Sequence, residues 1–138
     1  MMKVLLDTNV LFDFVLLRRP FASDATALWV ANEQVHYEAY VSGITPVNLF
    51  YVARKEIGMP LARQAIEELI TRIQICAIDM AVFQAAHALQ WSDYEDAVQH
   101  ASATASGVEA IVTRNLNHYK NAAIPVFSPA AFLVQLPR

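Results

Sequence analysis

The chain has 138 residues, a length expected for a single domain spanning residues 1–138 and large enough to bury a hydrophobic core. Hydrophobic residues make up 56% of the sequence and charged residues only 17%, a balance that excludes intrinsic disorder. Ten basic and thirteen acidic residues give a formal net charge of −3, unlike a protein that holds nucleic acid mainly by its phosphates. The single cysteine, Cys76, excludes an internal disulfide framework and a multi-cysteine zinc site, and it fits a reducing cytoplasm.

Short apolar runs alternate with helical patterns along the chain. The runs predict strands over residues 3–6, 37–42, 73–78, 110–113 and 124–127. Capping residues and apolar positions at helical spacing predict helices over residues 10–17, 23–32, 45–58, 60–71, 79–89 and 92–107, and a last helix that starts at 128–129. Strands rich in Val, Ile and Leu that are separated by helices indicate a mostly parallel sheet covered on both faces. We therefore expect one α/β domain with three layers, α/β/α, around a sheet of about five strands.

The apolar N-terminal stretch, residues 1–17, has the hydrophobicity of a signal peptide. Asp7 and Asp13 interrupt that stretch, and no small-residue cleavage site follows it. The chain also has no run of about 18 uninterrupted apolar residues, so we expect no membrane span. The sequence therefore predicts a cytoplasmic protein without a membrane partner.

Polar residues lie next to two of the predicted strands, at the edge where an open parallel sheet binds its ligands. Asp7 comes directly after the first strand, and Asn115 comes shortly after the fourth. Asp93 and Asp96 lie at the start of the helix that leads into the fourth strand. Because the carboxyl ends of parallel strands meet at one edge, we expect these side chains to lie close together.

Each of these acids also has a purely structural interpretation. Asp7 is suited to cap the first helix, and Ser92 with Glu95 forms the pattern of a capping box. Such a box accounts for Glu95 but does not need Asp93 or Asp96, which lie three residues apart on one helix face. Three carboxylates in one pocket repel one another unless protons or a cation such as Mg²⁺ or Mn²⁺ neutralise them. The residues alone leave capping and metal binding both open.

Four segments, in order from residue 3 to about residue 133, resemble the PIN-domain ribonucleases. The segment 4–11 (VLLDTNVL) is similar to the opening signature of that family, and 111–115 (IVTRN) is similar to its fourth motif. Residues 93–97 (DYEDA), which are followed by Ala101, Ala103, Ala105 and Gly107, are similar to the third motif of the family. The closing segment 124–129 (IPVFSP), with Phe132, fits the branch that comprises toxins of toxin–antitoxin pairs (VapC-like). The resemblance implies the PIN fold for the domain.

The resemblance also implies roles for particular residues. The aspartate after the first strand binds metal in PIN domains, and this position corresponds to Asp7. The acid that opens the helix before the fourth strand corresponds to Asp96, with Asp93 as a helper one turn earlier. The polar residue after the fourth strand corresponds to Asn115, and Asn48 stands where the family commonly has an acid. Both asparagines would position water or the scissile phosphate through hydrogen bonds.

Two residues near the fourth motif have open roles. His118 stands before Tyr119 where relatives often show an aspartate before an aromatic residue, and it is a candidate substrate or metal contact. Arg114 is either a contact to a substrate phosphate or an exposed arginine at a strand end without a role.

The function that the resemblance implies is a metal-dependent endoribonuclease that hydrolyses RNA phosphodiester bonds with Mg²⁺ or Mn²⁺. The branch implies the toxin of a type II toxin–antitoxin pair, with RNA as substrate, a small antitoxin as partner and commonly a homodimer. The neutral side chains of Asn48 and Asn115 keep a second hypothesis open, a PIN fold that has lost catalysis and acts as a binding module. A third class, another Mg²⁺-dependent phosphoryl-transfer enzyme, ranks below both because the chain lacks a paired Asp-x-Asp motif.

Overall fold

A parallel sheet of five strands forms the centre of the computed structural model, which describes residues 1–137. In that part of the chain the strands are β1 (Lys3–Leu6), β2 (Glu38–Ser42), β3 (Gln74–Cys76), β4 (Ala110–Val112) and β5 (Val126–Phe127). They pair in the order β3-β2-β1-β4-β5, and every pair is parallel. The predicted α/β class and the five parallel strands are confirmed, although β3 and β5 are shorter than the apolar runs that contain them.

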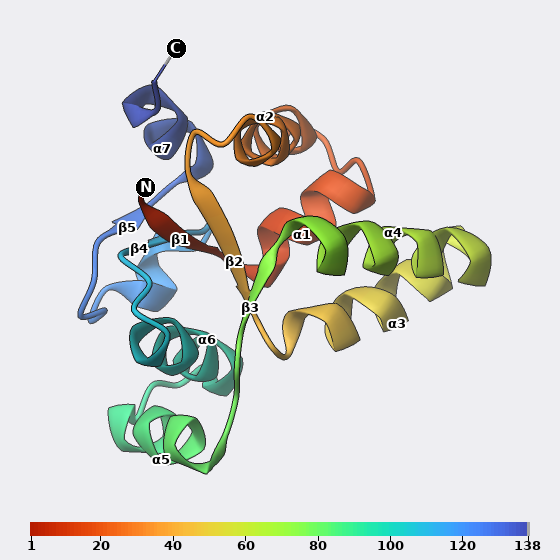
Figure 1. The fold of residues 1–138 in the computed structure, drawn as a ribbon. Coiled ribbons are helices and arrows are strands. Elements are labelled where there is room, and N and C mark those ends of the chain that lie inside the picture. The colour runs from red at the N-terminus through yellow and green to blue at the C-terminus, as the bar shows by residue number, and fades with distance from the viewer. Residues whose placement is uncertain (138) are drawn as a thin grey trace.

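Within residues 1–137, seven α-helices and one short 3-10 helix connect and follow the strands (Figure 1). The helices are α1 (Thr8–Val15), α2 (Ala22–Glu33), α3 (Thr45–Ile57), α4 (Met59–Arg72), α5 (Met80–Leu89), α6 (Tyr94–Ala105) and α7 (Pro129–Gln135), and the 3-10 helix is η1 (Leu116–Tyr119). Every predicted helix is present. Among the described helices, none has the length and apolar character that crossing a membrane requires.

The two faces of the sheet bury different side chains of the same strand, because successive residues of a strand point to opposite faces. In β1, Val4 and Leu6 join a core that is built with α1, α2, α3, α4 and α7, whereas Leu5 joins a second core with α6. Figure 1 shows α5 and α6 on one side of the sheet and α1 to α4 on the other. The chain therefore has the three layers expected from its sequence.

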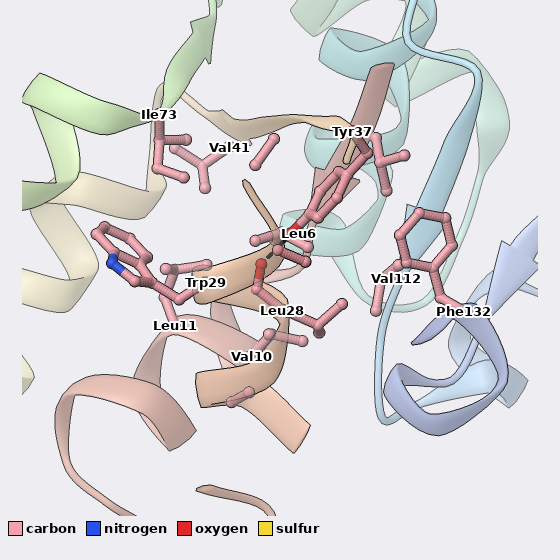
Figure 2. Packing of buried hydrophobic residues seen from close by; sticks show 14 of the residues in the cluster. Leu6, Val10, Leu11, Leu28, Trp29, Tyr37, Val41, Ile73, Val112 and Phe132 are labelled. Atoms are coloured by element: carbon pink, nitrogen blue, oxygen red, sulfur yellow. Dashed lines mark hydrogen bonds between the residues drawn. The ribbon is translucent and has the colours of Figure 1, made fainter. Parts of the chain in front are cut away.

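The larger core gathers aliphatic side chains around aromatic rings, among them those of Trp29, Tyr37 and Phe132 (Figure 2). The ring of Tyr37 lies edge-on to that of Phe132, with centroids 5.2 Å apart, and its hydroxyl donates to the Leu28 carbonyl at 2.8 Å. Phe14 stacks on Trp29 with centroids 4.6 Å apart. Burial raises the pKa of Tyr37, so this phenol stays a neutral hydrogen-bond donor that joins the residue before β2 to α2.

The register between β1 and β4 positions the polar residues at the ends of these strands. Leu6 lies opposite Val112, so Asp7 and Thr113 come next to each other just past the two strands. The backbone N–H of Asp7 donates to the carbonyl of Val112 at 2.9 Å and extends the pairing by one residue. Both residues therefore lie at the carboxyl edge of the sheet, where α/β proteins bind their ligands.

An ion pair between a buried aspartate and a partly exposed arginine ties α1 to the segment after β4. Asp13 is 1% exposed, and Arg114 Nη2 donates to its Oδ1 at 3.3 Å while Arg114 Nε donates to its Oδ2. The guanidinium also lies over the ring of Phe21, 3.9 Å from the centroid. Because Arg114 directly follows Thr113, this two-pronged contact holds the end of β4 against α1.

We predict that Arg114→Met lowers the free energy of unfolding by about 3 kcal/mol, because it leaves the buried Asp13 carboxylate without its partner. The matched control is Arg18→Met, since Arg18 pairs with Glu56 at the surface and its loss should cost less than about 1 kcal/mol. Urea unfolding followed by circular dichroism measures both substitutions. Equally small effects would contradict the structural importance of the Asp13 pair.

Candidate functional site

Asp7, the first residue after β1, is 3% exposed and accepts hydrogen bonds from several elements. Its Oδ2 accepts from Thr113 Oγ1 at 2.7 Å, and its Oδ1 accepts from Gln99 Nε2, in α6, at 3.2 Å. The same carboxylate caps α1 by accepting from the backbone N–H of Asn9 at 3.3 Å. Capping α1 and lying at the ligand-binding edge are therefore compatible roles for Asp7.

Gln99 orients Asp7 from within α6, and sequence reasoning missed it. Its side chain is fully buried; the amide nitrogen donates to Asp7, and the amide oxygen accepts from the backbone N–H of Thr8 at 3.2 Å. Thr8 Oγ1 in turn lies 2.8 Å from Thr45 Oγ1, which ties α1 to the start of α3. The spacing of Gln99 carries the missed signal, because it follows Asp96 by three residues and so shares its helix face.

Asp96, in the first turn of α6, is a second buried carboxylate, with 6% exposure. Its Oδ1 accepts from the Tyr119 hydroxyl at 3.2 Å, and its Oδ2 lies 2.9 Å from His118 Nδ1. Burial, and then the negative charges of Asp7 and Asp93, raise the pKa of Asp96 from its ordinary value of 3.8 to about 6. The two hydrogen bonds lower this pKa but do not offset the burial and the repulsion.

The N-terminus of α6 is capped differently from the sequence prediction. Asp93 is the N-cap residue, and its Oδ1 accepts from the backbone N–H of Asp96 at 3.0 Å. The Oε2 of Glu95 instead accepts from Asn48 Nδ2, in α3, at 2.9 Å. The capping box predicted for Ser92 and Glu95 is therefore wrong, because Asp93 satisfies the free N–H group and Glu95 finds its donor in another helix.

Glu95 is consequently a further carboxylate of the site. Burial raises its pKa, as do the negative charges of Asp7, Asp96 and Asp93, while the hydrogen bond from Asn48 lowers it. We call Asp7, Asp93, Glu95 and Asp96 the acidic cluster. Asn48 thus lies at the cluster, as the sequence predicts, and it contacts the cluster through Glu95.

Asn115 and Arg114, the two candidate residues that follow β4, differ from each other in how they contact their surroundings. The backbone N–H of Asn115 donates to Thr113 Oγ1 at 3.0 Å, whereas its exposed side chain forms no hydrogen bond within residues 1–137. Asn115 therefore reaches the site through its backbone. Arg114 pairs with Asp13 and covers Phe21, so the alternative of an exposed arginine without a role is wrong, and its guanidinium is already bound within the fold.

His118 adds an imidazole to a group of donor atoms that suits a cation. Asp93, Asp96 and His118 each offer one ligand atom, and these atoms lie within 4.8 Å of one another. Carboxylate oxygens are the donors that Mg²⁺ and Mn²⁺ prefer. The raised pKa values of Asp96 and Glu95 indicate that the protein's own donors do not neutralise the cluster. The donor set therefore fits a divalent cation.

The parallel α/β sheet, with acidic residues at its carboxyl edge, places this chain among the α/β proteins that bind ligands at that edge. Residues 3–117 match the family model of the PIN domain, and the chain belongs to the PIN domain family. A comparison with curated protein sequences finds no match.

Several solved structures share this fold. DNA-bound VapBC from Salmonella typhimurium matches with a TM-score of 0.73 and 20% identity, over 94% of this chain and 99% of that chain. A toxin–antitoxin complex from Klebsiella pneumoniae matches with a TM-score of 0.68 and 26% identity, over 91% and 97% of the two chains. VapC20 from Mycobacterium tuberculosis, a toxin that cleaves the sarcin–ricin loop, matches with a TM-score of 0.65 and 12% identity, over 78% and 86%. The predicted resemblance to PIN-domain and VapC proteins is confirmed.

The raised pKa of Asp96 makes the stability of the cation-free protein depend on pH. Its carboxyl group ionises at about 6 in the folded chain but near 3.8 when unfolded, so between these values the unfolded state binds fewer protons. We predict that this group lowers the free energy of unfolding as the pH rises through that window. Asp96→Asn should remove this fall and make the cation-free protein more stable than the wild type at neutral pH.

Thermal unfolding in the presence of a chelator, repeated across the window, measures this dependence. Asp24→Asn is the matched control, because Asp24 is an exposed aspartate in α2 and its loss should leave the wild-type pH dependence intact. Identical pH profiles for Asp96→Asn and the wild type would contradict the prediction.

Proposed function

We propose that this protein is a divalent-metal-dependent endoribonuclease that hydrolyses RNA phosphodiester bonds and is the toxin of a type II toxin–antitoxin pair. The observation that carries the proposal is the acidic cluster, in which burial and mutual repulsion raise the pKa values of Asp96 and Glu95. Such crowding of carboxylates costs stability and is typical of functional sites. In a PIN domain, a metal-dependent nuclease site accounts for it.

A Mg²⁺ or Mn²⁺ ion would be held by Asp7 and Asp96, with Asp93 joining directly or through a water molecule. His118, whose imidazole belongs to the same group of donor atoms as Asp93 and Asp96, would be a further contact to the ion. When bound, the ion supplies Lewis-acid chemistry, since it acidifies water, orients the phosphate and stabilises negative charge on its oxygens. Oxygen ligands of this kind suit either ion.

The surrounding side chains orient the carboxylates and position the substrate. Gln99 and Thr113 hold Asp7 in one orientation through their hydrogen bonds. Asn48 holds Glu95 with its amide nitrogen, and its amide oxygen, which has no partner within residues 1–137, accepts from the attacking water. Asn115, whose side chain is exposed and whose backbone N–H donates to Thr113, positions the scissile phosphate. Fixed donors of this kind lower the barrier because they need not reorganise during the reaction.

The partners and the setting belong to the same proposal. The K. pneumoniae structure that shares the fold is a toxin–antitoxin complex, which supports an antitoxin partner for this chain. VapC20 cleaves the sarcin–ricin loop, which supports RNA as the substrate. We further expect a homodimer in the cytoplasm, a reducing compartment that suits the buried free thiol of Cys76.

We predict that Asp7→Asn and Asp96→Asn each lower the rate of Mg²⁺- or Mn²⁺-dependent RNA cleavage by about 100-fold or more, because charge stabilisation by the cation is worth several kcal/mol. Cleavage of a labelled RNA pool measures the rates, and circular dichroism verifies that each variant folds. Asp24→Asn, on the exposed face of α2, should cleave at the wild-type rate. The proposed mechanism fails if folded variants of Asp7 and Asp96 keep full metal-dependent cleavage.

Calorimetric titration with Mn²⁺ separates the enzyme from the alternative, an inactive binding module. We expect the wild-type protein to bind Mn²⁺, and Asp96→Asn to bind it roughly 10- to 100-fold more weakly because the site loses a charged oxygen ligand. Absence of Mn²⁺ binding by the wild type would favour the binding module, which the neutral side chains of Asn48 and Asn115 motivate.

A further inference from the structure

A groove of about 610 Å³ lies beside the acidic cluster, between the turn that joins α5 to α6 and the segment that contains η1. One wall comes from residues 89–93 and the other from Asn117, His118, Lys120 and Asn121. Asp93 and His118 line this groove and also belong to the group of donor atoms that suits a cation. A molecule in the groove therefore lies next to the proposed reaction centre.

Polar side chains that the fold does not use line the groove. Gln90, Asn117, Lys120 and Asn121 are exposed, and their side chains form no hydrogen bond or ion pair within residues 1–137. Each of the three amides offers both donors and an acceptor to a ligand. Gln90 caps the C-terminus of α5 with a φ of 57°, a left-handed conformation that favours glycine. The end of the helix therefore gives no reason for a residue with an amide side chain at this position.

Trp91 gives the groove an apolar part. Its indole is half-buried and packs against His100, with ring centroids 4.9 Å apart, and against Tyr119 at 5.8 Å. A nucleobase has apolar faces and an edge of hydrogen-bond donors and acceptors, so it fits a wall that combines an aromatic ring with amides. The volume of about 610 Å³ also lies within the range of about 300–1,000 Å³ that is typical of small-molecule sites.

We propose that this groove binds the nucleotide next to the scissile phosphate of single-stranded RNA, an inference that rests on the proposed ribonuclease function. Gln90, Asn117 and Asn121 hydrogen-bond the edge of the base, and Lys120 contacts a flanking phosphate. The base must be unstacked and unpaired to enter, so duplex RNA does not fit. Recognition through bases also explains how a chain with a net charge of −3 holds RNA.

The first test measures binding of a fluorescein-labelled, mixed-sequence single-stranded RNA hexamer by anisotropy. The double variant Asn117→Ala/Asn121→Ala is compared with Gln84→Ala, an exposed amide of α5 that lies outside the groove. Every substitution is placed in the Asp7→Asn background so that the RNA stays intact. We expect the double variant, which loses two amide contacts to the base, to bind at least about tenfold more weakly, and the control to bind unchanged. Duplex RNA of the same sequences should bind more weakly and respond to neither change.

Cleavage of a random-sequence RNA pool is the second test, with Asp7 intact. We expect the wild type to prefer certain bases at one position beside the cut, and the double variant to lose that preference while keeping the same metal dependence. Equal hexamer binding by the double variant and the control, or an unchanged base preference, would overturn the assignment. If the wild type cleaves no RNA with either metal, the proposed function fails, and the binding measurement still decides whether the groove takes single-stranded RNA.

Discussion

Repulsion between buried carboxylates is the physical constraint on which the site depends. Asp7 at the end of β1 and the acids at the start of α6 lie close enough for their charges to raise the pKa values of Asp96 and Glu95. Ionised groups in such surroundings are tolerated only when donors or a cation compensate them. The protein supplies donors to each carboxylate, yet Asp96 keeps a pKa of about 6, so part of the charge is left for a ligand to neutralise.

The donors that hold the cluster come from four different elements or strand ends, and the site therefore depends on the packing of the whole sheet edge. They are Thr113 after β4, Gln99 in α6, Tyr119 in η1 and Asn48 in α3. The Asp13–Arg114 pair acts on the same edge, because Arg114 directly follows the threonine that binds Asp7. The same residues thus stabilise the fold and set the geometry of the site. The effects of substitutions at these positions on activity must therefore be separated from their effects on folding.

Sequence reasoning predicted the α/β class, the order of the elements and the meeting of Asp7 with Asp96 at one sheet edge. It failed for Glu95 and Arg114, in each case because the deciding partner lies far away along the chain. Asn48, 47 residues before Glu95, provides the hydrogen bond that replaces the expected capping box. Asp13, 101 residues before Arg114, provides the buried partner that no strand-end pattern indicates.

The sequence by itself determined which segments form strands and helices and which acids lie at strand and helix ends, because both depend on spacing along the chain. Only the tertiary structure decided the partner of each acid, namely Gln99 and Thr113 for Asp7 and Asn48 for Glu95. A hydrogen bond between distant residues requires a particular distance and angle, and these follow from the packing of helices on the sheet, which no local pattern encodes.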